Sequence, residues 1–263
     1  MDTSVVVTGA ARGIGRGIAE RLVARGHRVV VTDIDGDAVR RTAEEIGAAD
    51  GLAHDVRDPV GHRAVAEVAR AHGTLVAWFN NAGVGFDGNL TDLSEESARA
   101  LVEVNLLGVV WGMRTAIAAF GPDGGDIVNT ASLSAHGPVP GLSVYAATKA
   151  AVVSLTSSVS AEVPRRIRVH ALCPDGVDTA MVEAMDDLGT AKALVFSGGR
   201  ILTVAEAADA AVGLLGSRRV VRTVPAWRGA LSRSTALSPA LSGHTVDTFT
   251  WVGRKVMARS RRS

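Results

Sequence analysis

The first 225 residues alternate short β-branched runs with longer segments of helical period. Between the first two runs, Ile14, Ile18 and Leu22 recur at helical spacing, and Gly26 follows where a helix would end in a residue with positive φ. This alternation predicts repeated βαβ units, and therefore an α/β, doubly wound parallel sheet with helices on both faces. The strands are expected at residues 4–8, 28–33, 52–55, 75–79, 126–131, 167–172 and 220–224.

Composition limits the class of protein. With 263 residues, of which 47% are hydrophobic, the chain can bury a core of single-domain size, and we expect one domain over residues 1–225. A net charge of +1 gives no global field that would concentrate nucleic acid. No apolar run approaches the roughly 20 residues that span a bilayer, and no charged leader precedes the first strand, so we expect neither a transmembrane segment nor a secretory signal. Cys173 is the only cysteine, which predicts a reduced, cytoplasmic protein without an intrachain disulfide.

A glycine-rich turn, TGAARGIG at residues 8–15, joins the first strand to the first helix. Glycines let a ligand approach the backbone closely, and the N–H groups of the helix N-terminus can face a pyrophosphate. Such a pattern alone also suits a plain tight turn, but an acid at the end of the next strand favours dinucleotide binding. The residues expected along the phosphates are Gly9, Arg12, Gly13, Ile14 and Gly15.

The end of the second strand bears on which dinucleotide is bound. The carboxylate of Asp33 can accept hydrogen bonds from the adenosine ribose and would repel a 2′-phosphate, which favours NAD over NADP. Arg12 acts in the other direction, because a guanidinium in the glycine loop can reach a 2′-phosphate, although it can equally lie in solvent or touch the pyrophosphate. Asp55 and Val56 end the third strand and are expected to frame the adenine, where an acid can also simply form a turn.

Tyr145 and Lys149 are four residues apart in a helical segment, so their side chains project from one face. A phenol with a pKa of about 10 is a poor base at neutral pH, but a neighbouring ammonium and an oxidised nicotinamide both favour the phenolate. Tyr145 can then donate and accept a proton. Ser132 ends the fifth strand, at the sheet edge where this fold binds ligands, and its hydroxyl can polarise a substrate oxygen. The alternative is an ordinary amphipathic helix with a snorkelling lysine.

Several motifs follow one another along the chain: TGAARGIG at residues 8–15, NNAG at 80–83, Asn105, Ser132, and Tyr145 followed by Lys149. Together they resemble the short-chain dehydrogenase/reductase family over residues 4–224. The glycine spacing is similar to the compact, single-domain oxidoreductase branch of that family. The resemblance implies a Rossmann-type sheet of seven parallel strands in the order 3-2-1-4-5-6-7.

The resemblance also implies a mechanism. Hydride passes between the nicotinamide and the carbonyl carbon, while Tyr145 protonates or deprotonates the oxygen that Ser132 polarises. Lys149 holds the nicotinamide ribose, and Asn105 supports a water relay to Lys149. Taken alone, Asn105 equally suits a polar residue that is satisfied locally inside a helix. The wall between the nicotinamide and adenine halves is expected from Asn81, Ala82 and Gly83.

The segment after the sixth strand departs from the family pattern. Where the family usually has proline and glycine, this chain has Pro174 and Asp175 before Gly176. Aspartate tolerates positive φ better than most residues, so the turn can be retained, but a charge beside the nicotinamide leaves the preferred reaction direction open. By resemblance, Pro174 lies at the cofactor, Val177 contacts the edge of the nicotinamide ring and Thr179 binds its carboxamide.

Residues 180–200 lie where the family places its variable substrate lid. Apolar side chains there predict an alcohol or ketone substrate of medium size and largely apolar character. The same side chains also suit packing of the lid on the body of the protein, so both interpretations stay open. They are Met181, Met185, Leu188, Leu194, Val195 and Phe196.

The composition changes at residue 226, and residues 226–263 form a basic C-terminal extension with a net charge of +6. Apolar residues at helical spacing beside Trp251 suit docking on a partner subunit or peripheral contact with an anionic membrane, and a solvated end is the alternative. The extension replaces a short glycine-rich ending common in the family, which puts the usual tetramer contact in question. The basic residues are Arg228, Arg233, Arg254, Lys255, Arg259, Arg261 and Arg262, and the apolar stripe is Val246, Phe249, Val252 and Val256.

The sequence therefore predicts an NAD(H)-dependent oxidoreductase that interconverts a secondary alcohol and a ketone without a metal. We expect a homodimer or homotetramer that associates through the helices of Asn105 and Tyr145. One alternative is an NADPH-dependent biosynthetic ketoreductase, which cofactor titration would distinguish. Another is a non-catalytic, nucleotide-binding regulatory protein, which would have no need of the proton-transfer group.

Overall fold

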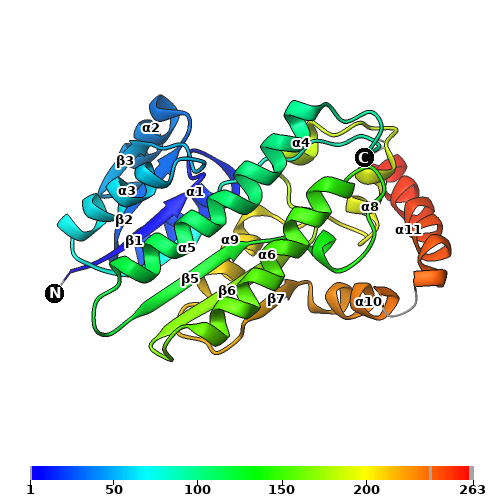
Figure 1. Ribbon diagram of the computed structural model, residues 1–263. Coiled ribbons are helices and arrows are strands. Elements are labelled where there is room, and N and C mark those ends of the chain that lie inside the picture. The colour runs from blue at the N-terminus through cyan, green and yellow to red at the C-terminus, as the bar shows by residue number, and fades with distance from the viewer. Residues whose placement is uncertain (1, 237–238, 261–263) are drawn as a thin grey trace.

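The computed structural model describes residues 2–236 and 239–260, and it centres on one parallel sheet (Figure 1). Its strands are β1 (Thr3–Thr8), β2 (Arg28–Asp33), β3 (Asp50–Ala53), β4 (Thr74–Asn80), β5 (Gly125–Thr130), β6 (Ile167–Pro174) and β7 (Val221–Val224). They lie in the order β3-β2-β1-β4-β5-β6-β7, and every neighbouring pair is parallel. The strand order reverses between β1 and β4, where the carboxyl ends of the strands leave a crevice for a ligand. The expected doubly wound, Rossmann-type fold is confirmed.

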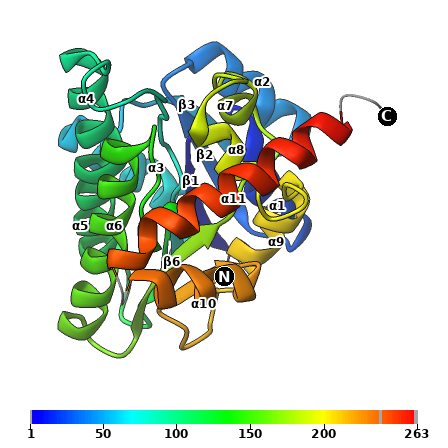
Figure 2. The same cartoon turned by 90° about the vertical axis from the view of Figure 1, so that its right-hand side faces the viewer.

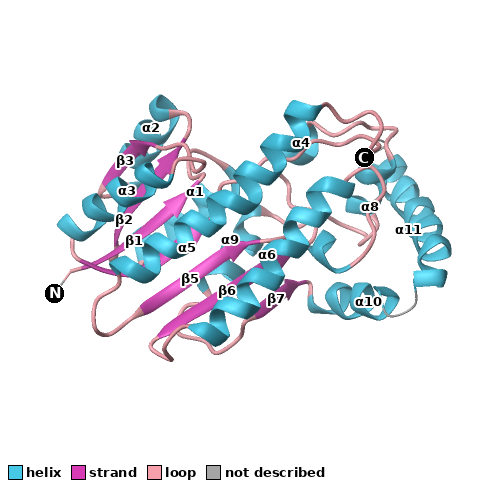
Figure 3. Ribbon diagram, viewed as in Figure 1, coloured by secondary structure: helices cyan, strands magenta, loops and turns pink. Residues whose placement is uncertain are grey.

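Helices cover both faces of the sheet (Figure 3). They are α1 (Gly13–Ala24), α2 (Gly36–Ile46), α3 (Pro59–Ala71), α4 (Glu95–Val102), the π-helical turn η1 (Glu103–Leu107), α5 (Gly108–Ala119), the 3₁₀ turn η2 (Leu133–His136), α6 (Ser143–Glu162), α7 (Ala180–Glu183), α8 (Thr190–Phe196), α9 (Val204–Val212), α10 (Ala226–Ala236) and α11 (Pro239–Ser260). The helices α1, α2 and α9 pack on one face, and α3, α5 and α6 pack on the other. Val5 and Val7 of β1 enter the first core and Val6 enters the second, so alternate residues of one buried strand fill both layers.

The third strand is the one whose position the sequence pattern misplaced. It spans Asp50–Ala53 rather than 52–55, a shift of two residues at both ends, whereas the other strands agree with the prediction to within one residue except at the end of β6, which lies two residues further on. Its polar start carries no hydrophobic signal, because this edge strand is positioned by its register against Val30 of β2. A side chain at Gly51 would lie 2.9 Å from the Val39 carbonyl oxygen, so glycine is what lets α2 pack this closely.

One helical run bears on the expectation that nothing spans a membrane. By length and average hydropathy alone, the continuous run Glu95–Ala119 is able to cross a bilayer, which the count of consecutive apolar residues did not predict. Core helices pass the same test. Within this run α5 packs on β4 and α3, and its residues Val109, Met113 and Ala116 are buried. These apolar residues are therefore accounted for by the core of the fold.

The C-terminal extension folds back over the end of the molecule where the strands terminate (Figure 2). α10 follows β7 and contacts η2, and α11 crosses α8. A Cβ at Gly253 would collide with the carbonyl oxygen of Ala193, so glycine permits this helix crossing. The helix expected around the apolar stripe is confirmed, whereas Arg261 and Arg262 lie outside the described residues. That residue 226 begins a separate unit stays a prediction.

Candidate active site

A cavity of about 1120 Å³ opens at the carboxyl ends of the strands. It is lined by the glycine loop and Asp33, by the ends of β5 and β6, and by the lid and the C-terminal extension. Of the catalytic and cofactor-binding residues predicted from the sequence, all but Gly15 and Asn105 line it. The topology thus brings together residues that are spread over most of the chain.

The glycine loop packs against the NNAG segment and leaves its backbone facing the cavity. Gly9 has a φ of +64°, and a Cβ there would lie 2.6 Å from the Cα of Ala82. A Cβ at Gly15 would collide with the Gly9 carbonyl oxygen, so Gly15 shapes the loop from behind and does not line the cavity. Thr8, which sequence reasoning did not single out, ties the two segments together because its Oγ1 accepts hydrogen bonds from the N–H groups of Asn81 and Ala82, both at 3.1 Å.

Asp33 and Arg12 both lie on the cavity wall, as expected. The Asp33 carboxylate accepts hydrogen bonds from the N–H groups of Ala11 (3.1 Å) and Asp35 (3.3 Å), which hold it at the end of β2. Arg12 is exposed at the N-terminus of α1. The two groups with opposite preferences for a 2′-phosphate are therefore both available.

Asp55 and Val56 line the same part of the cavity, together with His54, which sequence reasoning missed. The Asp55 carboxylate lies 2.6 Å from a nitrogen of Arg57, and this hydrogen bond lowers the pKa of Asp55. The buried His54 ring packs edge-on against His62, with 4.4 Å between ring centroids. Burial lowers the pKa of His54 to about 4, so this wall of the cavity carries a neutral ring.

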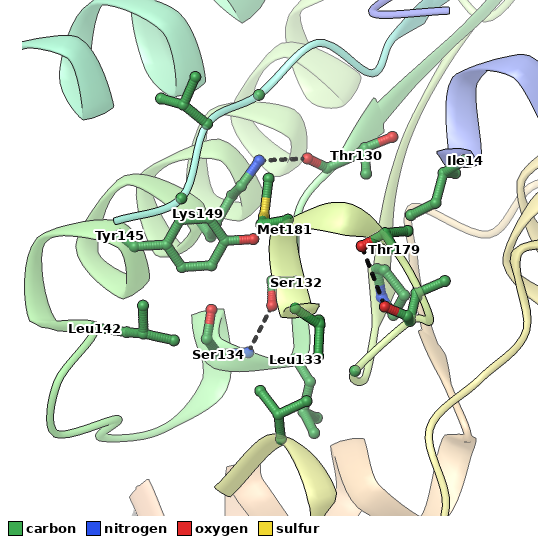
Figure 4. A pocket seen from close by; sticks show the side chains of 18 of the residues that line it. Ile14, Thr130, Ser132, Leu133, Ser134, Leu142, Tyr145, Lys149, Thr179 and Met181 are labelled. Atoms are coloured by element: carbon green, nitrogen blue, oxygen red, sulfur yellow. Dashed lines mark hydrogen bonds between the residues drawn. The ribbon is translucent and has the colours of Figure 1, made fainter. Parts of the chain in front are cut away.

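Tyr145 and Lys149 project from one face of α6 into the cavity (Figure 4). The Lys149 Nζ donates a hydrogen bond to the Thr130 carbonyl oxygen at 2.9 Å and lies 5.6 Å from the centroid of the Tyr145 ring. Burial lowers the pKa of Lys149 to about 8. Thr130 was absent from the predicted site because a backbone carbonyl partner leaves no mark on the sequence.

In the chain taken by itself, the pKa of Tyr145 is not lowered, and the expectation that Lys149 and an oxidised nicotinamide together favour the phenolate stays a prediction. Burial raises the pKa of Tyr145 to about 12, and a hydrogen bond with the Ser132 side chain lowers it only in part. Desolvation of the phenolate therefore outweighs the stabilising contacts that the protein provides. The Ser132 Oγ accepts a hydrogen bond from the Ser134 N–H at 3.2 Å. Figure 4 shows the hydroxyls of Ser132 and Tyr145 directed into the same part of the cavity.

Asn105 is buried in η1 and does not line the cavity. Its Oδ1 accepts from the Val84 N–H and its Nδ2 donates to the Val84 carbonyl oxygen, both at 2.9 Å. A Cβ at Gly83 would lie 3.1 Å from this Oδ1 and 3.5 Å from the Lys149 Nζ, so the amide and the ammonium flank one glycine. The side chain is thus satisfied locally, and its part in a water relay stays a prediction.

The end of β6 and the segment after it line the cavity through Pro174, Val177 and Thr179. No described residue other than glycine has a positive φ, so Asp175 does not adopt the conformation that the sequence analysis allowed for it. Its carboxylate instead forms an ion pair with Arg228 of the extension, with 2.8 Å between Oδ2 and Nε. The charge expected beside the nicotinamide is therefore compensated.

The lid supplies apolar side chains to the cavity, although fewer than predicted. Met181, Met185, Leu194 and Val195 line it, whereas Leu188 is 83% exposed and Phe196 is not in the lining. Leu188 lies in the turn between α7 and α8, which presents it to solvent. Sequence reasoning did not predict that the extension also contributes to the wall, through Arg228, Leu231, Ser232, Val246 and Phe249.

Comparison with known proteins places this chain among dehydrogenases. The family model for short chain dehydrogenases matches residues 3–188. The proteins of Mycobacterium tuberculosis described as probable oxidoreductase EphD are 38% identical over 193 residues, which is 69% of this chain and 32% of theirs, so the chain spans about a third of their length. The sorbitol dehydrogenase of Cereibacter sphaeroides is 38% identical over 188 residues, which is 70% of this chain and 73% of that protein.

Solved structures agree with this placement. A short-chain dehydrogenase/reductase from Burkholderia phymatum in complex with NAD has a TM-score of 0.79 at 28% identity, over 88% of this chain and 92% of that one. A blue fluorescent protein from a metagenomic library, in complex with NADPH, has a TM-score of 0.75 at 25% identity, over 84% of this chain and 96% of that one. The chain therefore belongs to the short-chain dehydrogenase/reductase family.

Proposed function

We propose that the protein is an oxidoreductase that transfers hydride between NAD(H) and a secondary alcohol or ketone. The observation that carries this proposal is the grouping of Tyr145, Lys149 and Ser132 on the wall of a cavity whose other wall is a glycine loop. The loop suits a dinucleotide, because Gly9 and Gly13, both with positive φ, line the cavity where the N-terminus of α1 opens on it. The sorbitol dehydrogenase relative supports an alcohol substrate.

The chain's own residues provide the proton chemistry. When bound, the nicotinamide supplies or accepts the hydride, and its oxidised ring carries a positive charge. Tyr145 holds the proton that passes to and from the substrate oxygen, and Ser132 donates a second hydrogen bond to that oxygen. Lys149 is anchored on Thr130 beside the phenol, where its positive charge favours the phenolate.

We further propose that NAD is preferred over NADP, because the carboxylate of Asp33 is held at the end of β2 by two backbone N–H groups. The NADPH-dependent ketoreductase is the second candidate. It is favoured by the exposed Arg12 on the same wall and by the structural relative that contains NADPH. Association as a homodimer or homotetramer through the continuous helical run that carries Asn105 and through α6, which carries Tyr145, belongs to the same proposal.

The test is a screen of secondary alcohols and ketones with NAD(H) and NADP(H), in which turnover is measured by nicotinamide absorbance. Tyr145→Phe should lower kcat by about 10² to 10⁴-fold, the usual contribution of a general acid–base group, while the Kd of the cofactor changes less than about twofold. Ser143→Ala, at an exposed position of the same helix, is the matched control. Wild-type turnover by Tyr145→Phe would refute the role of the phenol. Tight nicotinamide binding without turnover of any substrate would support the regulatory alternative.

A further inference from the structure

We propose that the C-terminal extension is a built-in wall of the substrate site, and that the ion pair between Asp175 and Arg228 holds it in place. The inference rests on the proposed function for the identity of the ligand, but the position of the wall is a property of the chain alone. In this proposal Asp175 and Arg228 are positioning residues, and Phe249 determines which substrates fit.

Arg228 lies in the first turn of α10, and its guanidinium is the point where four segments of the chain meet. Its Nε donates to the Asp175 carboxylate after β6 at 2.8 Å, and its Nη2 donates to the Ser197 Oγ at the end of the lid, also at 2.8 Å. Its Cζ lies 5.1 Å from the centroid of the Phe249 ring in α11. One side chain thus joins the nucleotide side of the cavity, the lid and both helices of the extension.

This ion pair is enclosed by the protein. The side chains of Asp175 and Arg228 are only 9% and 8% exposed, and a Cβ at Gly198 would lie 3.0 Å from the Asp175 Oδ2. Separating a buried pair leaves two uncompensated charges, which is far more costly than breaking an ion pair in solvent. We therefore expect α10 and α11 to stay closed over the cavity while substrates enter elsewhere.

The closed extension presents apolar side chains to the cavity. Leu231 of α10 and Val246 and Phe249 of α11 line it together with the lid residues Met181 and Met185. The Arg228 charge is already matched by Asp175, so it offers little attraction to an acidic substrate. The part of the substrate that faces the extension is therefore an apolar substituent on the carbon that carries the hydroxyl or carbonyl.

The wall is tested with Phe249→Ala and a series of secondary alcohols of increasing chain length. Removing the ring should raise the ratio of kcat/KM for long over short alcohols by about tenfold, the effect of a methylene or more in an apolar pocket. Trp251→Ala is the matched control, because Trp251 lies on the same helix and is 58% exposed. An unchanged ratio in Phe249→Ala, or an equal change in both variants, would overturn the assignment.

The anchoring is tested with the double variant Asp175→Asn/Arg228→Gln, which removes both charges and leaves no buried ion unpaired. We expect KM for the best alcohol to rise about tenfold and kcat to change less than about threefold, the pattern of lost binding rather than lost chemistry. Arg228→Lys keeps the positive charge but not the planar guanidinium, so its KM should lie between those of the wild type and the double variant.

Hydrogen exchange of the protein without substrate separates this proposal from the proposed function. In the double variant, amide exchange in α10 and α11 should become at least about tenfold faster, while exchange in β1 and β4 stays as in the wild type. This result would support the anchor even if the screen found no substrate. Unchanged exchange in both helices, or an unchanged KM, would refute the anchor and leave the proposed function intact.

Discussion

His54 gives the stability of the fold a pH dependence that follows from its surroundings. Burial, and to a lesser extent the neighbouring His62, lower the pKa of its imidazole to about 4. The ring is 6% exposed, and its Nδ1 lies 3.1 Å from the Thr32 Oγ1. An unfolded histidine has a pKa of about 6.5, so the unfolded chain binds a proton over a range in which the folded chain does not.

The sign and size of the effect follow from this difference. Between pH 6.5 and pH 4 the unfolded state binds more protons, so the free energy of unfolding falls as the pH falls through that window. The difference between a pKa of 6.5 and one of about 4 corresponds to a total loss of about 3 kcal/mol in the free energy of unfolding once the pH is below this window. At pH 5 the loss is about 2 kcal/mol. The full contribution of His54 is present above about pH 7.

The measurement is urea unfolding, monitored by tryptophan fluorescence, at pH values from about 5 to 8. His54→Asn should lower the free energy of unfolding at pH 8, because the packing of the ring is lost. On going from pH 8 to pH 5, however, the free energy of unfolding should fall by about 2 kcal/mol less in this variant than in the wild type. Thr32→Val is the matched control, because it removes the hydrogen-bond partner and keeps the titrating ring. If His54→Asn retained the full wild-type slope, another group would govern this window and the reasoning would be refuted.

Two carboxylates lead to the remaining predictions. Asp33→Ala with Arg12 retained should shift the ratio of the Kd values for NAD and NADP toward NADP by about tenfold or more, because close like charges repel by more than the 1.4 kcal/mol that this factor requires. Fluorescence titration with both cofactors measures the ratio, and a wild-type preference for NADPH would contradict the argument. Burial acts to raise the pKa of Asp126, but hydrogen bonds from His170 and Arg168 outweigh it, so the pKa is lowered. The ionised carboxylate therefore stabilises the folded state above about pH 4, and this contribution is lost as the pH falls below the pKa of the unfolded state. Asp126→Asn should cost about 2 kcal/mol in urea unfolding at neutral pH, and an unchanged midpoint would show that the network contributes nothing.

The sequence was informative wherever local periodicity and burial coincide. The central strands are covered on both faces, so they must be continuously apolar, and the run Val29, Val30 and Val31 can be recognised without tertiary information. Tyr145 and Lys149 were predictable as a pair because the spacing within a helix determines their common face. His54 and Thr130 could not be predicted, because their roles come from an edge-on contact between two rings and from a backbone carbonyl, neither of which produces a periodic signal.

The pairing of Asp175 with Arg228 shows a different limit of sequence reasoning. In the sequence, the acid after β6 and the basic extension are two separate departures from the family pattern, 53 residues apart. In the structure they compensate each other, because a carboxylate enclosed at this position requires a cation and α10 delivers one. An acid at position 175 without an arginine from the extension would leave a buried charge unpaired, and the arginine without the acid would do the same. The two departures therefore act as one feature, which joins the C-terminal extension to the loop after β6 that lines the cavity.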